Sequence, residues 1–463
     1  MKAWERARDL LRNAVPVVLS DEEQDWQDDA DAIGSKTDFD IAMFWKSSVP
    51  GSGAPDSSAA AAIGAMENKG YTLAPYESIL TEGFAALEVN DMPALHVAHM
   101  RLWQILKAAK PNPDHPSQKT RRYQDWPDFE AAVNWPIAAP YAIGGERYVD
   151  SIRGGWWAQI VGAAAGTALE GYTAEQLAKK FGPIRDYPRK PNTFNDDITY
   201  ELCFLEAYAE KGRGVSPVDI AERWVGLIPF GWSAEGIALE HLHRGVMPPE
   251  SGRLNNPFDE WIGAQMRGAI CGMVAPGDVR EAARLAWLDG EISHTSNGIL
   301  GEVFNAMLCA GAFVETDMRK LTAATVELMP EESEYGQVVR FAVDACRRAQ
   351  SWQEAWRICD EHLVEYHWIH VYPNAAAQIV ALWFGHDSFD HMLEIICGCG
   401  HDVDCNAAQI LCAYSVAHGE GSIDRRWVDP LGPVIQTYMR RPTSIAFEEL
   451  ARQTVEAARK WRA

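Results

Sequence analysis

Four aspartates in two short stretches are the residues of this chain best suited to chemistry. Asp402 and Asp404 lie two positions apart in GHDVDCNAAQILCA, and Asp196 and Asp197 are adjacent in NTFNDDITYELCFLEA. Each pair stands ahead of a run whose apolar residues predict a buried helix. Burying a carboxylate without a positive partner is costly. If the two pairs meet in space they need cations, and a site built of oxygen donors favours magnesium, manganese or calcium over zinc.

Helix capping is a second interpretation of the same residues. Asn195 or Asp196 would cap a helix that begins there, and acids in a first turn complement the helix dipole, each contributing about 1 kcal/mol. One such cluster alone would favour capping. Two Asp-rich helix starts, each leading into a buried segment, favour a shared cation site.

Composition places the chain among globular proteins and argues against two classes of partner. Of 463 residues, 47% are hydrophobic, which is enough for a sizeable core. A net charge of -23 opposes binding to a nucleic-acid backbone, which needs clustered Lys and Arg. No signal-peptide pattern follows Met1 and no apolar run is long enough to span a membrane, so we expect a cytoplasmic protein without a membrane partner. The nine cysteines are scattered through apolar patterns and are expected to be reduced core thiols.

The elements that must position the acids are predicted to be helices. Four segments carry apolar residues at helical spacing or all round, and no alternating strand series or glycine-rich phosphate loop appears. These segments are 155–171, 297–316, 376–385 and 407–419. We therefore predict an all-α fold.

Residues 1–147 are predicted to form a helical N-terminal extension packed on a catalytic region at 148–463. The extension contains the linker SSVPGSGAPDSS and an acidic stretch at 20–31. This stretch lacks the Gly and terminal Glu spacing of a calcium loop, so a solvated charged surface is favoured over a metal-binding loop. The aromatic residues of the extension that are expected to wall the binding cleft are Phe44, Trp45, Tyr123 and Trp126.

Four motifs, in this order, resemble the ADP-ribosylglycohydrolase family. They are GAAAGTALEGYTAEQLAKKFGPI, NTFNDDITYEL, ISHTSNGILGEVFNAMLCAGAF and GHDVDCNAAQILCAYSVAHGEGSIDRRWVDPL. The resemblance implies an orthogonal bundle of helices around a two-magnesium centre. Such a centre binds a ribose through its hydroxyls and cleaves the bond at the anomeric carbon.

The resemblance also implies a set of metal ligands, which would be Asn195, Asp196, Asp197, Asp402, Asp404 and Cys405. Asn195 and Cys405 both stand where the family has Thr. An amide oxygen still suits a hard cation, whereas a thiol is a poor ligand for magnesium. One of the two metal sites is therefore expected to be weak, completed by water or empty.

Glu170 aligns with the family's catalytic glutamate if a gap is placed before Thr167, because GTALEG is shorter than the usual motif. The alternative is an ordinary Glu at a helix end. Glu170, Asp196 and Asp197 are the resulting candidates for general acid and base. The residues that the resemblance implies for substrate binding are Ser293, His294, Asn297, Gly298 and His401. On residue type alone, His294 would instead be a hydrogen-bonded core histidine.

We therefore expect a magnesium-dependent, or manganese-dependent, glycohydrolase that acts on a small-molecule riboside or an ADP-ribosylated substrate. The 18 Trp residues, some of them in the extension, favour a walled pocket for a compact ligand. The alternative is a binding module that has lost catalysis and senses a ribosylated metabolite. Cys405 and the short first motif favour that module, and the four intact aspartates favour the enzyme.

Overall fold

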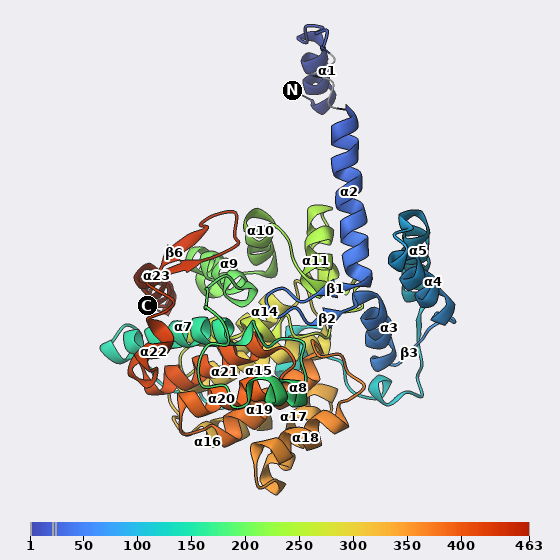
Figure 1. The fold of residues 1–463 in the computed structure, drawn as a ribbon. Helices are drawn as coiled ribbons and strands as arrows, with labels where there is room; N and C mark the ends of the chain where they lie inside the picture. The colour runs from blue at the N-terminus through green and yellow to red at the C-terminus, as the bar shows by residue number, and fades with distance from the viewer. Residues whose placement is uncertain (1, 21–22, 24–25, 463) are drawn as a thin grey trace.

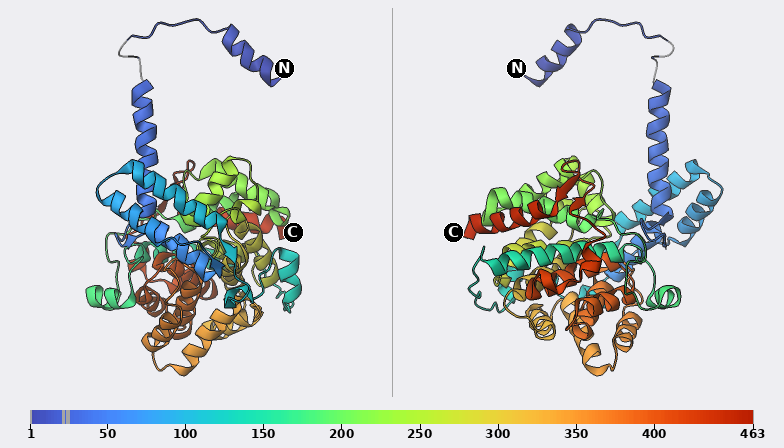
Figure 2. Two further views of the ribbon diagram at one scale, coloured as in Figure 1. Left: turned by 90° about the vertical axis from the view of Figure 1, so that its right-hand side faces the viewer. Right: turned by 60° about the vertical axis from the view of Figure 1, so that its left-hand side comes forward.

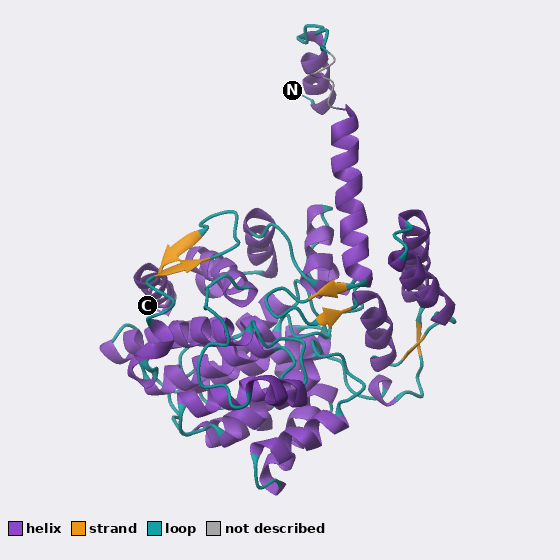
Figure 3. Cartoon of the chain, viewed as in Figure 1, coloured by secondary structure: helices purple, strands orange, loops and turns teal. Residues whose placement is uncertain are grey.

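The described part of the chain is almost entirely helical, which confirms the prediction of an all-α fold (Figures 1 and 3). This computed structural model describes residues 2–20, 23 and 26–462. The acidic stretch at 20–31 falls partly outside these residues, so both interpretations of it stay predictions. Among the described helices, none is long and apolar enough to cross a membrane.

The elements follow one another along the chain in a fixed order. The α-helices are α1 (Ala3–Arg12), α2 (Trp26–Trp45), α3 (Ser58–Asn68), α4 (Glu77–Glu88), α5 (Met92–Ala108), α6 (Trp126–Ala132), α7 (Glu146–Gly166), α8 (Ala174–Phe181), α9 (Asp196–Lys211), α10 (Pro217–Leu227), α11 (Ser233–His243), α12 (Glu250–Arg253), α13 (Ala269–Val274), α14 (Val279–Gly290), α15 (Ser296–Ala312), α16 (Met318–Leu328), α17 (Glu334–Arg348), α18 (Trp352–His362), α19 (Val371–Phe384), α20 (Phe389–Cys399), α21 (Val403–His418), α22 (Arg425–Val428) and α23 (Phe447–Arg462). Short 3-10 helices are η2 (Pro116–Gln118), η3 (Gly212–Gly214), η4 (Gln265–Arg267) and η5 (Glu420–Ser422). Three antiparallel strand pairs are β1 (Ser47–Ser48) with β2 (Pro55–Asp56), β3 (Tyr71–Thr72) with β4 (Lys110–Pro111), and β5 (Val434–Gln436) with β6 (Ser444–Ala446).

The four segments predicted to be core helices are buried as expected. They correspond to α7, α15, α19 and α21, whose side chains are almost all inaccessible to solvent. Each of the nine cysteines is buried, so the prediction that they lie in the core is confirmed.

The N-terminal helices share a small core of their own with residues from later in the chain. Trp45, Leu95 and Leu102 pack there with Phe258 and Trp261. Helix α2 stands out from the body of the molecule, while α3, α4 and α5 gather beside its inner end (Figures 1 and 2).

Two of the aromatic residues expected to wall the cleft are instead core residues. Trp45 is 0% exposed and packs edge-on against Phe84, and Tyr123 is 1% exposed and packs edge-on against Phe129. A side chain that is fully enclosed by protein cannot line an open cleft. For Trp45 and Tyr123 the prediction is wrong, because Trp45 packs in the small core of the N-terminal helices and Tyr123 packs in the main core.

Helices α7 and α21 lie against each other through residues without bulky side chains. A Cβ atom built on Gly162 would lie 2.7 Å from the backbone carbon of Ala407. One built on Gly166 would lie 2.3 Å from the Cα of Asp404. The last turn of α7 therefore sets the position of the backbone that carries Asp404.

We expect Gly166→Ala to destabilise the protein by about 1–3 kcal/mol, because the added methyl group forces α7 away from α21. Thermal unfolding followed by circular dichroism measures this loss. Gly226→Ala in α10 is the matched control, since a Cβ there meets nothing within 4 Å and alanine is the better helix former. Equal stability of the two variants would show that the α7–α21 contact tolerates a methyl group.

Candidate active site

The starts of α9 and α21 bring two groups of acids together. Asp402 is the N-cap of α21, and ligand atoms of Asp402, Asp404 and Cys405 all lie within 4.8 Å of one another. Asn195 is the N-cap of α9, and its Nδ2 donates a hydrogen bond to Asp404 Oδ2 at 3.3 Å. This contact places Asp196 and Asp197, in the first turn of α9, beside the second group.

Glu170 reaches the same place through a pair of main-chain hydrogen bonds between two loops. The N–H of Gly171 donates to the carbonyl of His401 at 3.0 Å, and the N–H of His401 donates to the carbonyl of Tyr172 at 3.1 Å. Gly400 has φ of +77°, and a Cβ there would lie 2.3 Å from the Tyr172 carbonyl, so only glycine fits. The two loops therefore hold Glu170 against the start of α21.

The crowding of carboxyl groups changes their protonation. Burial, together with the charge of Asp404 and a side-chain hydrogen bond to it, raises the pKa of Glu170 well above its usual value. Burial and the charge of Asp404 also raise the pKa of Asp197 and Asp402. Burial, Asp404 and then Glu235 raise the pKa of Asp196 to about 7. Without a bound cation, the protein places too little positive charge near these carboxyl groups for them to ionise at their usual pH.

Three carboxylate oxygens in this cluster are buried without a hydrogen-bond partner among the described residues. They are both oxygens of Asp197, a residue that is 0% exposed, and Oδ1 of Asp402. Leaving a buried polar atom unpaired costs about 1–3 kcal/mol, and more when the group is charged. Oxygen donors with free lone pairs are suited to a hard divalent cation, so the residues present fit a magnesium or manganese ion.

Asn195 and Cys405 each have a protein partner beside the cluster. Asn195 Oδ1 accepts the Ile198 N–H at 3.4 Å, so the predicted helix cap is confirmed. Cys405 Sγ lies 3.9 Å from Met266 Sδ, and burial with the nearby Asp197, Asp402 and Asp404 carboxylates raises the pKa of the thiol. Cys405 is therefore a neutral thiol beside the acids.

The residues predicted to bind substrate at the start of α15 are buried and bonded to protein. Arg267 Nη2 donates to Ser293 Oγ at 3.0 Å, and Ser293 Oγ lies 2.7 Å from His294 Nδ1. Asn297 Nδ2 donates to Glu260 Oε1 at 3.0 Å, and Asn297 Oδ1 accepts the Tyr335 N–H at 3.2 Å. These bonds engage Ser293, Asn297 and His294 Nδ1, while His294 Nε2 is buried without a hydrogen-bond partner among the described residues. A role in substrate binding stays a prediction.

Gly298 and His401 complete the predicted substrate-binding set. A Cβ on Gly298 would lie 2.4 Å from the carbonyl of Asp259, so glycine permits this close packing. His401 Nε2 lies 3.0 Å from Asp360 Oδ1, and its ring packs edge-on against Trp356. The His401 backbone holds the Glu170 loop, whereas its ring contacts α18.

Glu235 is a residue near the acids that the sequence prediction missed. It is 3% exposed, lies in the first turn of α11, and accepts a hydrogen bond from Arg267 Nη1 at 3.0 Å. An acid at a helix start was the pattern that singled out the two aspartate pairs, so this pattern would also have found Glu235. Glu235 has no second acid next to it in the sequence, so it did not stand out as the aspartate pairs did.

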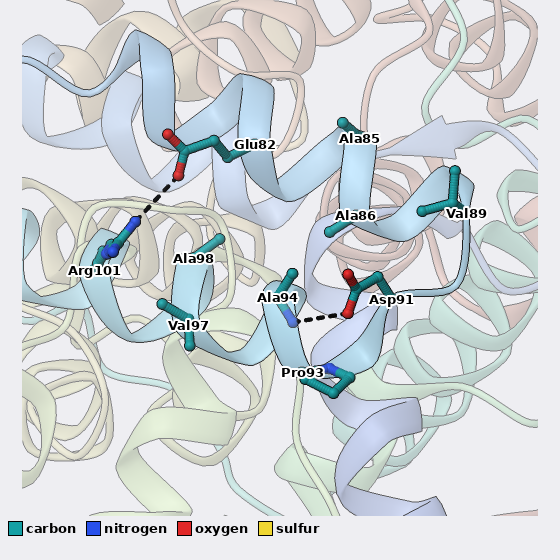
Figure 4. Close-up of a pocket in the computed structure, with 10 residues that line it drawn as sticks. All are labelled: Glu82, Ala85, Ala86, Val89, Asp91, Pro93, Ala94, Val97, Ala98 and Arg101. Carbon is teal, nitrogen blue, oxygen red and sulfur yellow. Dashed lines mark hydrogen bonds and ion pairs between the residues drawn. The ribbon is translucent and has the colours of Figure 1, made fainter.

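A shallow surface pocket of about 770 Å³ lies elsewhere, between α4 and α5 (Figure 4). Its lining is mainly apolar, with Ala85, Val89 and Val97, and Arg101 bridges to Glu82 at its edge. None of the predicted site residues lines it. We therefore assign no catalytic role to this pocket.

Comparison with known proteins agrees with this architecture. The family model described as ADP-ribosylglycohydrolase matches residues 145–463. A solved structure titled "ADP-ribosylglycohydrolase-related protein complex" is 20% identical, with a TM-score of 0.50, and the match covers 68% of this chain and 99% of that chain. At this identity the structural likeness shows the fold alone. No curated protein matches the chain.

The family model, which covers more than half of the chain, defines the class: the protein is a hydrolase of glycosyl bonds. The chain belongs to the ADP-ribosylglycohydrolase family, as the four motifs predicted.

Proposed function

We propose that the protein is a metal-dependent glycohydrolase that cleaves the bond at the anomeric carbon of a ribosyl substrate. The observation that carries this proposal is the set of unpaired, buried carboxylate oxygens on Asp197 and Asp402. Asp196 and Asp404 lie beside them and would complete the oxygen ligands for magnesium or manganese. Asn195 and Cys405 lie beside these aspartates.

The side chains around the cluster supply the remaining chemistry. A bound divalent cation supplies positive charge that orients the sugar hydroxyls and makes nearby water more acidic. Glu170 and one of Asp196 or Asp197 are the groups that would pass protons, one to the leaving group and one from water. The carboxylates would also stabilise the positive charge that builds on the ribose ring as the bond breaks.

The N-terminal extension is proposed to pack on the catalytic region and to favour a compact riboside. Tyr172 Oη donates to the carbonyl of Ser52 at 3.2 Å, and Arg189 Nη1 donates to the carbonyl of Gly51 at 2.8 Å. The turn between β1 and β2 thus lies on the loop that carries Glu170. Because this turn covers the loop, small ribosides should reach the site more easily than a modified protein does.

Magnesium should stabilise the wild-type protein and should not stabilise Asp197→Asn. At about 100 times the dissociation constant, the gain for wild type is about 2.7 kcal/mol. Without metal, Asp197→Asn should be the more stable protein by about 1–3 kcal/mol, because the amide carries no charge and so avoids the cost of burial and of repulsion from Asp404 that raises the pKa of Asp197 in the folded protein. Thermal unfolding in EDTA and in magnesium measures both effects.

The control for this experiment is Asp344→Asn, whose side chain is 62% exposed on α17. It should respond to magnesium as wild type does. A wild-type protein that gains no stability from either magnesium or manganese would contradict the metal site, whatever its activity.

Cys405→Thr should bind magnesium as tightly as wild type or more tightly. A hydroxyl oxygen is a better ligand for a hard cation than a thiol, and the two side chains are similar in size. Calorimetric titration with magnesium measures the affinity. A large loss of affinity in the Thr variant would show that the thiol contributes to binding in a way that hard-ligand chemistry does not explain.

A further inference from the structure

Half of the large apolar side chains that are exposed among the described residues lie in the first 100 residues of the chain. Out of 22 such side chains, these are Trp4, Leu11, Val15, Val17, Val18, Leu19, Ile33, Phe39, Val89, Val97 and Met100. Exposed apolar side chains gathered in one part of a molecule are typical of an interaction surface. Most of them belong to two surfaces, one on α1 and the segment that follows it, the other on α4 and α5.

Helix α1 has an apolar face that is turned to solvent. Trp4, Ala7 and Leu11 follow one another at spacings of three and four, so they lie on the same face of the helix. Trp4 is 61% exposed and Leu11 is 78% exposed. Figure 2 shows α1 lying apart from the body of the molecule. Because an isolated helix of this length is marginal in water, α1 needs a partner for its apolar face.

The pocket between α4 and α5 has the shape to receive a helix (Figure 4). We call it the alanine groove, since its small lining residues are Ala85, Ala86, Ala94 and Ala98. Side chains this small leave space for those of another helix, and Val89 and Val97 add apolar contacts beside them. At 1.5 Å per residue, α1 is about 15 Å long and α4 is about 18 Å long. The groove therefore matches α1 in length.

The two surfaces carry opposite charge. Residues 2–12 contain four Lys or Arg and two acids, whereas residues 71–100 contain four acids and no Lys or Arg. Arg6 and Arg8 stand on either side of Ala7, so they border the apolar face of α1. Glu88 and Asp91 are exposed at the turn between α4 and α5. A basic amphipathic helix is thus matched to an acidic groove.

We infer that the apolar face of α1 binds the alanine groove of a second copy of this chain, and that the second copy returns the same contact. Each copy carries both surfaces, so the exchange closes with two-fold symmetry and leaves neither surface free. The positive charge of α1 also lowers the repulsion between two chains whose net charge is -23 each. This inference concerns assembly and does not depend on the proposed function.

Helix α2 favours a second copy over the same chain as the partner of α1. Its inner end is anchored by Trp45, which packs edge-on against Phe84 of α4, and its 20 residues span about 30 Å. The outer end of α2 therefore carries α1 away from the groove of its own chain (Figures 1 and 2). Docking within one chain would leave Ile33 and Phe39 exposed at 69% and 64%, whereas a second arm running alongside would cover them.

The test measures the oligomeric state of the full chain by sedimentation velocity over a range of micromolar concentrations. Wild type should form a dimer of twice the 51.4 kDa chain mass. Leu11→Glu on α1 and Ala85→Lys in the alanine groove should each raise the dissociation constant of the dimer about 30-fold or more. Val364→Asp is the control, because this side chain is 75% exposed outside both surfaces. Circular dichroism should show the same helical content in every variant.

Mixing the two variants separates exchange between copies from docking within one chain. The Leu11→Glu copy keeps an intact groove, and the Ala85→Lys copy keeps an intact α1. An equal mixture should therefore recover a dimer that neither variant forms alone at the same concentration. No recovery on mixing would contradict the exchange.

Three other results would overturn the inference. One is a wild type that stays monomeric while its α1 amides are protected from hydrogen exchange and lose this protection in Ala85→Lys, which would assign α1 to its own groove. Another is a monomer that binds vesicles of phosphatidylcholine and phosphatidylserine through α1, with binding lost in Leu11→Glu and kept in Ala85→Lys. The last is a dimer that neither substitution weakens.

Discussion

Asp402→Asn is expected to lower kcat/KM for ribosyl substrates by about 100- to 1,000-fold or more, while the helical content stays unchanged. The substitution keeps the size of the side chain and makes it uncharged, and Asp402 Oδ1 has no hydrogen-bond partner among the described residues. A cation would therefore lose a charged ligand, and the transition state would lose part of its electrostatic stabilisation. Initial rates over a range of magnesium concentrations, with circular dichroism on the same samples, measure both outcomes.

Two comparisons make this result specific to the site. Asp387→Asn, at a side chain that is 67% exposed, should keep wild-type activity. Treatment of wild type with EDTA should reproduce the loss seen in Asp402→Asn, and added magnesium or manganese should restore activity to wild type alone. Full activity of Asp402→Asn in EDTA would rule out a metal centre built on these aspartates.

Arg122→Met is expected to destabilise the protein by about 3–5 kcal/mol. Arg122 Nη1 lies 2.7 Å from Glu260 Oε1, and Glu260 is 3% exposed. Removing the guanidinium leaves a buried carboxylate that still accepts a hydrogen bond from the Asn297 amide but has lost its closest positive charge. Lys69 makes a similar pair with Asp259 at 2.6 Å, so both pairs join the N-terminal extension to one loop of the catalytic region. Urea unfolding followed by circular dichroism measures the loss.

The adjacent residue provides the control. Arg121 is 46% exposed and pairs with surface acids, so Arg121→Met should cost about 1 kcal/mol or less. The double variant Arg122→Met with Glu260→Gln should recover much of the stability, because it removes the unpaired charge. If Arg121→Met and Arg122→Met cost the same, the buried pair does not hold the extension in place.

Local patterns in the sequence were sufficient to predict the core helices and to single out the two pairs of aspartates. Asp196 and Asp404 follow recognisable helix caps, and the long apolar runs leave α15 and α21 no stable position except the core. That these helix starts meet depends on packing between distant segments, such as the approach of Gly166 to Asp404. The spacing of residues along the chain does not show that the two helix starts meet. That expectation was strengthened by the resemblance to a known family.

The sequence could not indicate which polar residues are bonded within the protein. Ser293 and Asn297 look available in a list of polar residues, yet Arg267 and Glu260 bond to them in the fold. The position of Tyr438 beside Phe194 depends on the turn between β5 and β6, and no pattern in the sequence indicates it. Burial and partners are properties of the folded chain, and residue type alone predicts them poorly.

The main-chain bonds between Gly171, Tyr172 and His401 also constrain how this family can vary. Since backbone atoms make the bonds, the number of residues in each loop is restricted. An insertion in one loop would shift Glu170 away from Asp404 unless the other loop changed with it. We expect natural variants of this protein to lengthen or shorten the two loops together.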